Sequence, residues 1–336
     1  MENFDADKIK DMEYDPSRGR YVAKDGREFK STPYSNGTGY KYDYYGSTTY
    51  KNAKHNLKSK VFQKTSQFQR ISQQLTEVGG ADYALFIRAD IWSEEFLRNI
   101  RQSVKKDMIA YQWDGMNRFP QVWQNLQWFD RFYVFDPKDF HGESYQFLPI
   151  TNFYLDYPLE DNSITSDFYF IGSHLSDRQD VIIKFGQLAK KNSWKLDFNI
   201  ICKEKDIPEL SREYAVIDNI KVIGEIREFQ DNLKYICKAK VLIDFVTSDH
   251  SGLSFRVFEA LGYEKKLITT NAEVVHYDFY HPDNIFIWDG KNLNGIEEFL
   301  DKPYKPIDPK IKQKYSFSNW IKYLLNLKPY TEITLP

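Results

Sequence analysis

Short apolar runs alternate with amphipathic segments along most of the chain. The runs have the length and the aromatic and β-branched content of buried strands, and they lie at 83–87, 108–113, 132–135 and 145–150. Helical periodicity occupies 93–104, where Ser93 is a candidate N-cap, and 121–128. Strands that alternate with helices are typical of parallel βαβ units. The first half of the chain is therefore predicted to hold an α/β sheet.

The same alternation restarts after a polar, irregular stretch at 151–166. Strands are expected at 168–171, 196–202, 221–223, 241–246, 266–270 and 284–288. Helices are expected at 177–190, 227–238 and 252–261, with two more near 295–300 and 318–325. We interpret 151–166 as an interdomain linker between two consecutive Rossmann-like halves. Ligands of such sheets bind at the carboxyl ends of the strands, so the expected site is a cleft between the domains.

The first part of the chain has a different pattern. Residues 1–50 carry no apolar run of strand length, although Tyr42, Tyr44 and Tyr45 fit one short strand. A polar helical pattern spans 52–78, and Gly79-Gly80 is its stop signal. Its basic residues predict either a solvated helix face or contact with anionic lipid; they are Lys51, Lys54, Lys58, Lys60, Lys64 and Arg70.

Composition narrows the class of protein. Aromatic residues make up 17 % of the 336 residues, which excludes wholesale disorder, and the net charge of −2 argues against a dedicated nucleic-acid binder. No apolar stretch reaches membrane-spanning length, and the acidic N-terminus does not resemble a signal peptide, so a cytoplasmic location is expected. Cys202 and Cys237 are expected to be reduced, buried thiols.

Several common motifs are missing from the chain. No G-x-G-x-x-G follows a predicted strand, and no P-loop, CxxC or HExxH is present. A dinucleotide dehydrogenase, a P-loop kinase and a zinc site are therefore not expected. We expect neither a bound cofactor nor a metal.

The sharpest candidate site lies in the stretch 244–271, DFVTSDHSGLSFRVFEALGYEKKLITTN. A buried strand is followed by a small polar loop and then by a helix predicted to begin at Gly252. The free N–H groups of a helix start form an anion site, and Gly252 lets a phosphate approach closely. Ser251 and Ser254 can donate hydrogen bonds to its oxygens.

The same helix carries Arg256 and Glu259, three residues apart and so on one face. An arginine suits a diphosphate, and a carboxylate suits a pair of sugar or ribose hydroxyls. The alternative is a well-capped helix with a surface Arg–Glu pair.

A second strand–loop–helix junction has the sequence FYFIGSHLSDR at 168–178. Gly172 and Ser173 are expected to line the same cleft, and His174 and Arg178 to contact phosphate. The alternative for His174 is an ordinary loop histidine.

Acidic residues follow three predicted strands of the first half: Asp90, Asp114 and Asp136. An acid at this edge of a sheet suits a general base for an incoming hydroxyl group. The alternative role is helix capping, which is common at such positions.

The order of these segments resembles one known family. The segments IRAD, YQWDG, FDRFYVFDPKD, YQFLPI, FYFIGSHLSDR, VLIDFV, SGLSFRVFEALGYEKKLITTN, DFYHPDNIFI and KYSFSNW span about residues 80–325. The chain resembles bacterial lipopolysaccharide-core and capsular-polysaccharide glycosyltransferases of GT-B type, the CgeB-like, group 1 set. Trp113-Asp114-Gly115 departs modestly from the family's W-D-S.

The resemblance implies an α/β GT-B fold, with two Rossmann-like domains facing a central cleft. An acceptor-side domain would span 1–155, a nucleotide-sugar domain 165–305, and a tail helix within 306–336 would cross back. The family usually begins with a hydrophobic strand, a glycine-containing loop and an amphipathic helix, which the polar residues 1–40 do not provide.

The resemblance also implies roles for individual residues. Asp114 or Asp90 would be catalytic on the acceptor side. The donor would contact Gly172, Ser173, His174, Arg178, His250, Ser251, Gly252, Leu253, Ser254, Arg256 and Glu259. The E-x7-E signature of retaining relatives is not met, since Lys266 stands seven residues after Glu259. The stereochemical outcome therefore stays open.

The expected activity is metal-independent transfer of a sugar from a nucleotide sugar to a cell-surface polysaccharide or lipopolysaccharide. The acceptor would be a glycan or a lipid-linked glycan, with peripheral contact at the inner membrane and no nucleic acid as partner. Two alternatives stay open: a GT-B-fold epimerase or phosphorylase that uses the same donor pocket, and a non-catalytic scaffold subunit.

Overall fold

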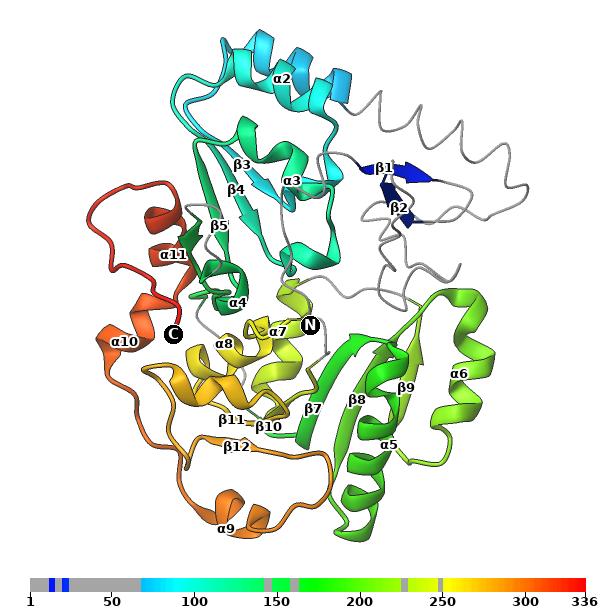
Figure 1. Cartoon of the computed structure of the whole chain (residues 1–336). Helices are drawn as coiled ribbons and strands as arrows, with labels where there is room; N and C mark the ends of the chain where they lie inside the picture. The colour runs from blue at the N-terminus through cyan, green and yellow to red at the C-terminus, as the bar shows by residue number, and fades with distance from the viewer. Residues whose placement is uncertain are drawn as a thin grey trace. The chain divides into compact units, whose positions relative to one another are not determined.

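The computed structural model describes residues 12–15, 20–23, 68–141, 147–157, 163–224, 229–246 and 250–336. The chain divides into two compact units. Unit 1 draws on Met1–Ala110, Met116–Arg131 and Gly142–Gln146, and unit 2 draws on Tyr111–Gly115, Phe132–His141 and Phe147–Pro336. Figure 1 shows the course of the chain. The residues that carry the candidate site lie almost entirely in unit 2.

Unit 1 begins with a hairpin of β1 (Met12–Asp15) and β2 (Arg20–Ala23), which pair antiparallel. A helix is described from residue 68, and it ends before Gly79 and Gly80, which both have positive φ. The Gly80 N–H donates to the Leu75 carbonyl at 2.7 Å and closes the helix, as a glycine stop signal predicts. The predicted strand at Tyr42–Tyr45 and residues 52–67 of the predicted helix lie outside the described residues.

The next elements follow the predicted alternation. They are β3 (Ala84–Ile87), the 3-10 turn η3 (Ala89–Ile91), α2 (Glu94–Ser103), β4 (Met108–Gln112), η4 (Met116–Arg118), α3 (Val122–Asn125) and η5 (Leu126–Trp128). Ser93 caps α2, because its hydroxyl oxygen accepts the Phe96 N–H at 3.3 Å. The apolar face of α2 packs on Phe86 and Met108. The Ser93 cap and the α2 helix are thus confirmed.

Two further strands complete this sheet, β5 (Arg131–Val134) and β6 (Leu148–Pro149), and the short helix α4 (Pro137–Phe140) follows β5. The strand order is β3-β4-β5-β6, and β6 runs parallel to β5. The strand predicted at 145–150 is confirmed only as two residues. Residues 142–146 lie outside the described part.

Unit 2 contains a six-stranded sheet made of β7 (Ser166–Ser173), β8 (Leu196–Ile201), β9 (Ile220–Ile223), β10 (Ala239–Asp244), β11 (Lys266–Thr269) and β12 (Ile285–Ile287). The spatial order is β12-β11-β10-β7-β8-β9, and every neighbouring pair is parallel. This is the doubly wound Rossmann order, in which the strand sequence reverses between β7 and β10. The predicted α/β class is confirmed.

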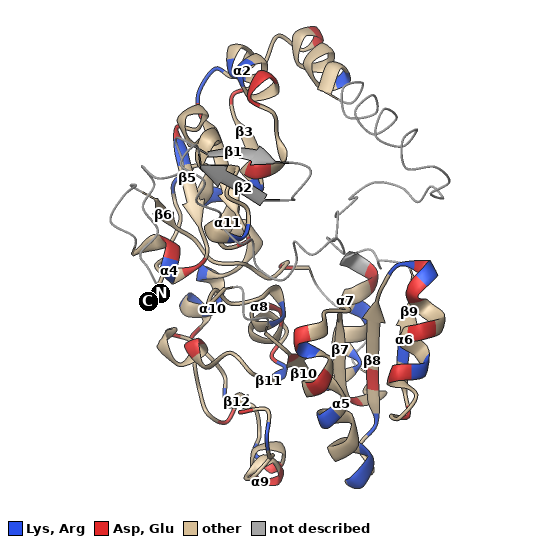
Figure 2. Cartoon of the chain, turned by 45° about the vertical axis from the view of Figure 1, so that its right-hand side comes forward, with Lys and Arg blue, Asp and Glu red and all other residues tan. Residues whose placement is uncertain are grey.

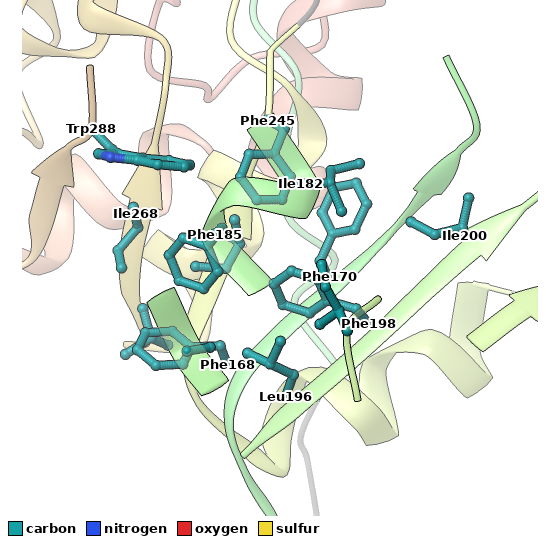
Figure 3. Close-up of a cluster of buried hydrophobic side chains, with 14 of the residues drawn as sticks. Phe168, Phe170, Ile182, Phe185, Leu196, Phe198, Ile200, Phe245, Ile268 and Trp288 are labelled. Atoms are coloured by element: carbon teal, nitrogen blue, oxygen red, sulfur yellow. The ribbon is translucent and has the colours of Figure 1, made fainter. Parts of the chain in front are cut away.

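Helices cover both faces of this sheet. They are α5 (Ser176–Lys191), α6 (Ile207–Tyr214), α7 (Phe229–Cys237), α8 (Phe255–Gly262) and α9 (Ile296–Asp301), followed by α10 (Pro309–Lys314) and α11 (Phe317–Leu324). Alternate residues of a strand point to opposite faces. Phe168 and Phe170 therefore join one core with Phe185 of α5, shown in Figure 3, while Tyr169 joins a second core with Phe258 of α8.

The structure contains several elements that were not predicted. They include the strands β1 and β2 and the helices α4, α6 and α10. Each of these helices has a proline in its first turn: Pro137, Pro208 and Pro309. Proline at that position is a helix-start signal, because the missing N–H has no intrahelical partner there. These helices are only 4, 8 and 6 residues long, so each offers one or two turns of pattern to read.

Two other expectations can be compared with the described residues. Cys202 and Cys237 are buried thiols that are not joined in a disulfide, as predicted. Acidic and basic residues are interspersed over α5 and α6, as Figure 2 shows. Within the part of the chain that the structure describes, no helix combines the length and apolar character needed to cross a bilayer.

Candidate functional site

The switch point of the six-stranded sheet brings the two predicted junctions together. Strands β7 and β10 are neighbours, with Phe168 opposite Val241. Residues 174–178 follow the carboxyl end of β7, and the described residues 245–246 and 250–256 follow that of β10. Ligands of doubly wound sheets bind at this edge. The next question is which groups the two junctions present there.

Arg178 of α5 bridges the two strand ends. Its Nη2 donates to the Ser173 carbonyl, and its Nη1 lies 3.4 Å from the Phe245 carbonyl. Its guanidinium also lies 5.6 Å from the centre of the Phe170 ring. A β-carbon at Gly172 would come within 2.9 Å of Phe170 Cζ and 3.0 Å of Arg178 Nη2. The glycine therefore makes room for the arginine.

His174 faces the other side of β7. Its backbone N–H donates to the Ile201 carbonyl of β8 at 2.7 Å, and its Nδ1 lies 3.2 Å from the Tyr214 hydroxyl of α6. Burial is the main cause that lowers the pKa of His174. These contacts place the imidazole toward β8, whereas Arg178 reaches toward β10. The phosphate contact predicted for His174 stays a prediction.

The helix that follows β10 begins later than predicted. We expected it at Gly252, but α8 begins at Phe255. The physical reason is a set of side chains that hold the segment 251–254 outside the helix. Ser251 donates its N–H to Asp136 Oδ2 at 3.1 Å, and its carbonyl accepts from Asn271 Nδ2 at 3.1 Å. These bonds take the place of intrahelical ones.

Two more side chains fix the same segment. The Leu253 carbonyl accepts from Asn152 Nδ2 at 2.9 Å, and the Asn152 side-chain oxygen accepts in turn from the Tyr111 hydroxyl. His250 Nδ1 lies 3.0 Å from the Gly252 carbonyl, so this nitrogen carries the proton that is shared with the carbonyl. The segment 250–254 is thus tied down mainly through its carbonyl groups.

Glycine at position 252 is required by packing. A β-carbon there would lie 2.6 Å from Cδ2 of Phe135 and 2.9 Å from the Phe135 carbonyl oxygen. The backbone oxygen cannot move aside as a flexible side chain could. The predicted close approach of a phosphate to Gly252 is therefore not needed to explain the glycine.

The backbone N–H groups of 252–254 differ from the carbonyl groups of this segment. Among the residues that the structure describes, no acceptor is found for the backbone N–H groups of Gly252, Leu253 and Ser254. Gly252 and Leu253 are buried. Buried N–H groups without an acceptor are rare in proteins, and successive ones next to a helix start form an anion-binding concavity. The segment is therefore suited to an anion.

The Ser254 hydroxyl is used within the protein. It donates to Asp244 Oδ1 at 2.8 Å, and Thr269 donates to the other oxygen of the same buried carboxylate at 2.7 Å. These bonds join the start of α8 to β10 and β11. The hydrogen bond from Ser254 to a ligand oxygen was a prediction, and in this structure the hydroxyl hydrogen already has another acceptor.

Arg256 and Glu259 form a buried pair, so the interpretation as a surface pair is wrong. Their side chains are 11 % and 2 % exposed, and Arg256 Nη1 lies 2.6 Å from Glu259 Oε2. Arg256 Nη2 lies 3.5 Å from the Ile171 carbonyl near the end of β7. Burial raises the pKa of Glu259, and the Arg256 charge opposes that rise. Arg256 thus approaches β7 from the side of α8, as Arg178 does from α5.

The predicted catalytic acids have different surroundings. The Trp113 ring lies 6.3 Å from that of Phe255, the first residue of α8, so the turn that holds Asp114 is close to the helix start. Asp90 belongs to unit 1, where its side chain is 3 % exposed and its oxygens accept from Arg88 at 2.5 and 3.1 Å. The catalytic roles of Asp114 and Asp90 stay predictions.

Sequence reasoning missed several residues that shape the site. Asp136 had two interpretations, and it caps α4 by accepting the Lys138 N–H at 3.1 Å. Asp244, Asn271 and Asn152 were not considered. Each lies at, or within three residues of, the carboxyl end of a strand. A search for short polar side chains at strand ends would have found them.

The positive charge that the site presents comes from arginines and backbone N–H groups. Among the described residues, no three His, Cys, Asp or Glu side chains are grouped as metal ligands. Arg178, Arg256 and the 252–254 segment can donate hydrogen bonds to the oxygens of an anion. Guanidinium groups bind such oxygens in a bidentate manner.

A scan against models of protein families found no match for the chain, and a search of curated protein sequences found none either. Among solved structures, the chain is similar to the apo form of lipopolysaccharide outer core galactosyltransferase WaaB, at 14 % identity and a TM-score of 0.42 over 81 % of each chain. It is similar to S. aureus MnaA in its co-structure with UDP, at 13 % and 0.46 over 81 % of this chain and 83 % of that one. It is also similar to a putative UDP-N-acetylglucosamine 2-epimerase from Listeria monocytogenes, at 8 % and 0.45 over 80 % of each. Likenesses at these values identify no family for this chain.

Proposed function

We propose that the protein is a GT-B-type glycosyltransferase that binds a nucleotide-sugar donor at the switch point of the six-stranded sheet. One observation carries this proposal. Two guanidinium groups, from Arg178 and Arg256, reach the carboxyl end of β7 from opposite sides, and the N–H groups of 252–254 at the start of α8 have no acceptor among the described residues. A diphosphate needs this combination of charge and donors.

The chemistry follows from the positions of these groups. When the bond between the sugar carbon and the diphosphate oxygen breaks, the arginines and N–H groups stabilise the charge of the leaving diphosphate. An acceptor hydroxyl forms the new bond to that carbon and gives its proton to a carboxylate. Asp114 is the candidate base, since Trp113 beside it packs at the start of α8.

The finer parts of the proposal rest on the resemblance in sequence. The acceptor is a cell-surface polysaccharide or lipopolysaccharide glycan, which a cytoplasmic enzyme meets at the inner membrane. Arg70 is the one basic residue of the helix predicted at 52–78 that lies within the described part. Sugar transfer requires no resident cofactor and, with arginines at the diphosphate, no metal.

The test is calorimetric titration with UDP-, GDP-, CMP- and dTDP-sugars. We expect one nucleotide class to bind, and Arg256→Lys and Arg178→Ala each to weaken binding about ten-fold or more, since hydrogen bonds to charged groups contribute about 1.5–3 kcal/mol. Arg212→Ala is the matched control, because Arg212 lies exposed on α6 and donates to the Pro208 carbonyl. Folded protein that binds none of the four classes contradicts the proposal.

A second measurement separates transfer from the alternative activities. Purified protein is incubated with the donor that binds, with and without polysaccharide acceptors, and the products are identified by mass spectrometry together with NMR spectroscopy, which distinguishes epimers. Product that forms only with acceptor supports transfer. Isomerised sugar nucleotide formed without acceptor indicates an epimerase, and binding without any turnover indicates a scaffold subunit.

A further inference from the structure

Arg256 is linked through hydrogen bonds to side chains of α8, α7 and β7. Glu259 on α8 accepts from Arg256 at 2.6 Å, and Asn232 on α7 lies 3.4 Å from the other oxygen of that carboxylate. Asn232 accepts in turn from the Tyr169 hydroxyl on β7 at 2.5 Å. The Arg256 guanidinium lies 5.3 Å from the centre of the Tyr169 ring. We call these four residues the Arg256 network.

Burial of the Arg256 network costs desolvation free energy, and a contribution to the stability of the fold does not by itself explain that cost. Glu259 is 2 % exposed, Asn232 is 8 % exposed and Tyr169 is fully buried. Buried ion pairs often contribute little net stability, because desolvation of both charges offsets their attraction. Such a pair is better explained by the orientation that it imposes on one member.

The orientation imposed here is that of Arg256. With Nη1 held by Glu259, Nη2 is directed to the Ile171 carbonyl near the carboxyl end of β7. An arginine side chain has several rotatable bonds, and holding it in one geometry removes that entropy before a ligand arrives. The guanidinium edge at the switch point is thereby fixed in the free protein.

We propose that Glu259, Asn232 and Tyr169 are positioning residues that fix the Arg256 guanidinium for the diphosphate, and that Glu259 does not contact the hydroxyl groups of the donor. The affinity part of this proposal rests on the proposed function. The orientation part concerns the free protein alone. The two parts are therefore tested separately.

The first experiment is NMR of the side-chain Nε–Hε group of Arg256 in the ligand-free, uniformly ¹⁵N-labelled protein. The resonance is assigned by its absence in Arg256→Lys. We expect an order parameter near that of rigid backbone, roughly 0.85, which falls to about 0.6 or lower in Glu259→Gln. Asn232→Ala and Tyr169→Phe should give intermediate values. The control is Ile236→Val, which loses one buried methyl group on α7 and leaves the network intact. An unchanged order parameter in Glu259→Gln overturns the proposal.

The second experiment measures the affinity for pyrophosphate, UDP and GDP. On charge alone, Glu259→Gln should strengthen anion binding, because a carboxylate next to Arg256 is removed. Positioning predicts the opposite, a loss of roughly five-fold or more. Tighter or unchanged binding in Glu259→Gln contradicts a positioning role.

The two experiments keep the proposals apart. If the wild-type protein binds none of the three anions, the proposed function fails, while the order parameters still decide whether the network fixes Arg256. If Glu259→Gln and Asn232→Ala unfold, the order parameter of Arg256 in Tyr169→Phe still decides whether the network fixes the guanidinium group. This variant keeps the ring and removes only the hydroxyl group.

Discussion

The junctions that follow β7 and β10 have similar sequences but different structures. After β7, helix α5 begins at Ser176, only three residues beyond the end of the strand, and its first turn has no side-chain cap. After β10, helix α8 begins at Phe255, and the preceding residues are held by Asp136, Asn152 and Asn271. The first junction presents the guanidinium group of Arg178. The second presents the guanidinium group of Arg256 together with backbone N–H groups.

If an anion binds at these junctions as we propose, a strand, small residues and a helix present donors to it in two ways. At the first junction the backbone carbonyls of Ser173 and Phe245 are covered by Arg178. At the second, neighbouring side chains donate to the carbonyls of 251–253, and the N–H groups of 252–254 have no acceptor among the described residues. Glycine is needed at both junctions, but it contacts a flexible side chain at Gly172 and rigid backbone at Gly252.

The largest expected effect separates the two glycines. Gly252→Ala should cost about 1–3 kcal/mol or more of unfolding free energy, because the new methyl group meets the Phe135 ring and carbonyl. Gly172→Ala should cost less, because Arg178 can shift, but it should weaken anion binding. Thermal melts and pyrophosphate titrations of both variants check this. Equal losses of unfolding free energy in Gly252→Ala and Gly172→Ala would contradict the distinction between the two glycines.

The next effect concerns the side chains that hold 251–254. Asn271→Ala removes the donor to the Ser251 carbonyl and the acceptor of the Glu273 N–H. Leaving these groups unpaired should cost about 1–3 kcal/mol. Denaturant unfolding measures the loss. Asn292→Ala, in an exposed turn, serves as the control, and a loss no greater than in that control would show that the segment holds its shape without Asn271.

A smaller effect compares two serines near the two helix starts. Ser254→Ala deprives buried Asp244 of a donor and should cost about 1 kcal/mol. Ser176→Ala, at the exposed start of α5, should change stability by no more than about 0.5 kcal/mol. Chemical denaturation compares the pair. A larger loss of unfolding free energy in Ser176→Ala than in Ser254→Ala would contradict this prediction.

The smallest expected effect is the pH dependence at His174. Burial lowers its pKa below the usual 6.5, so the unfolded chain takes up the proton more readily than the folded protein. The stability that neutral His174 contributes is present above pH 6.5 and is lost as the pH falls below it. Melting temperatures from pH 8 to 5.5 should therefore fall more steeply for wild type than for His174→Gln. His276→Gln, an exposed site outside both junctions, should follow wild type. Parallel curves for wild type and His174→Gln would contradict the prediction.

Periodicity predicted the strands well because each buried strand has a continuous apolar run. Helices α6 and α10 were missed, since their segments are only 8 and 6 residues long and carry several charged side chains besides the starting proline. The start of α8 was misplaced because Asp136, Asn152 and Asn271 act on it from positions distant in sequence. Burial of the Arg256–Glu259 pair depends on α7 packing against α8, which i,i+3 spacing alone does not indicate.

The central claim is that a nucleotide-sugar diphosphate binds at the switch point between β7 and β10. A crystal structure of the protein with its donor bound tests this most directly. The account predicts diphosphate oxygens within hydrogen-bonding distance of Arg178, of Arg256 and of the N–H groups of 252–254. A donor bound at another edge of the sheet, with those groups unchanged, would contradict it.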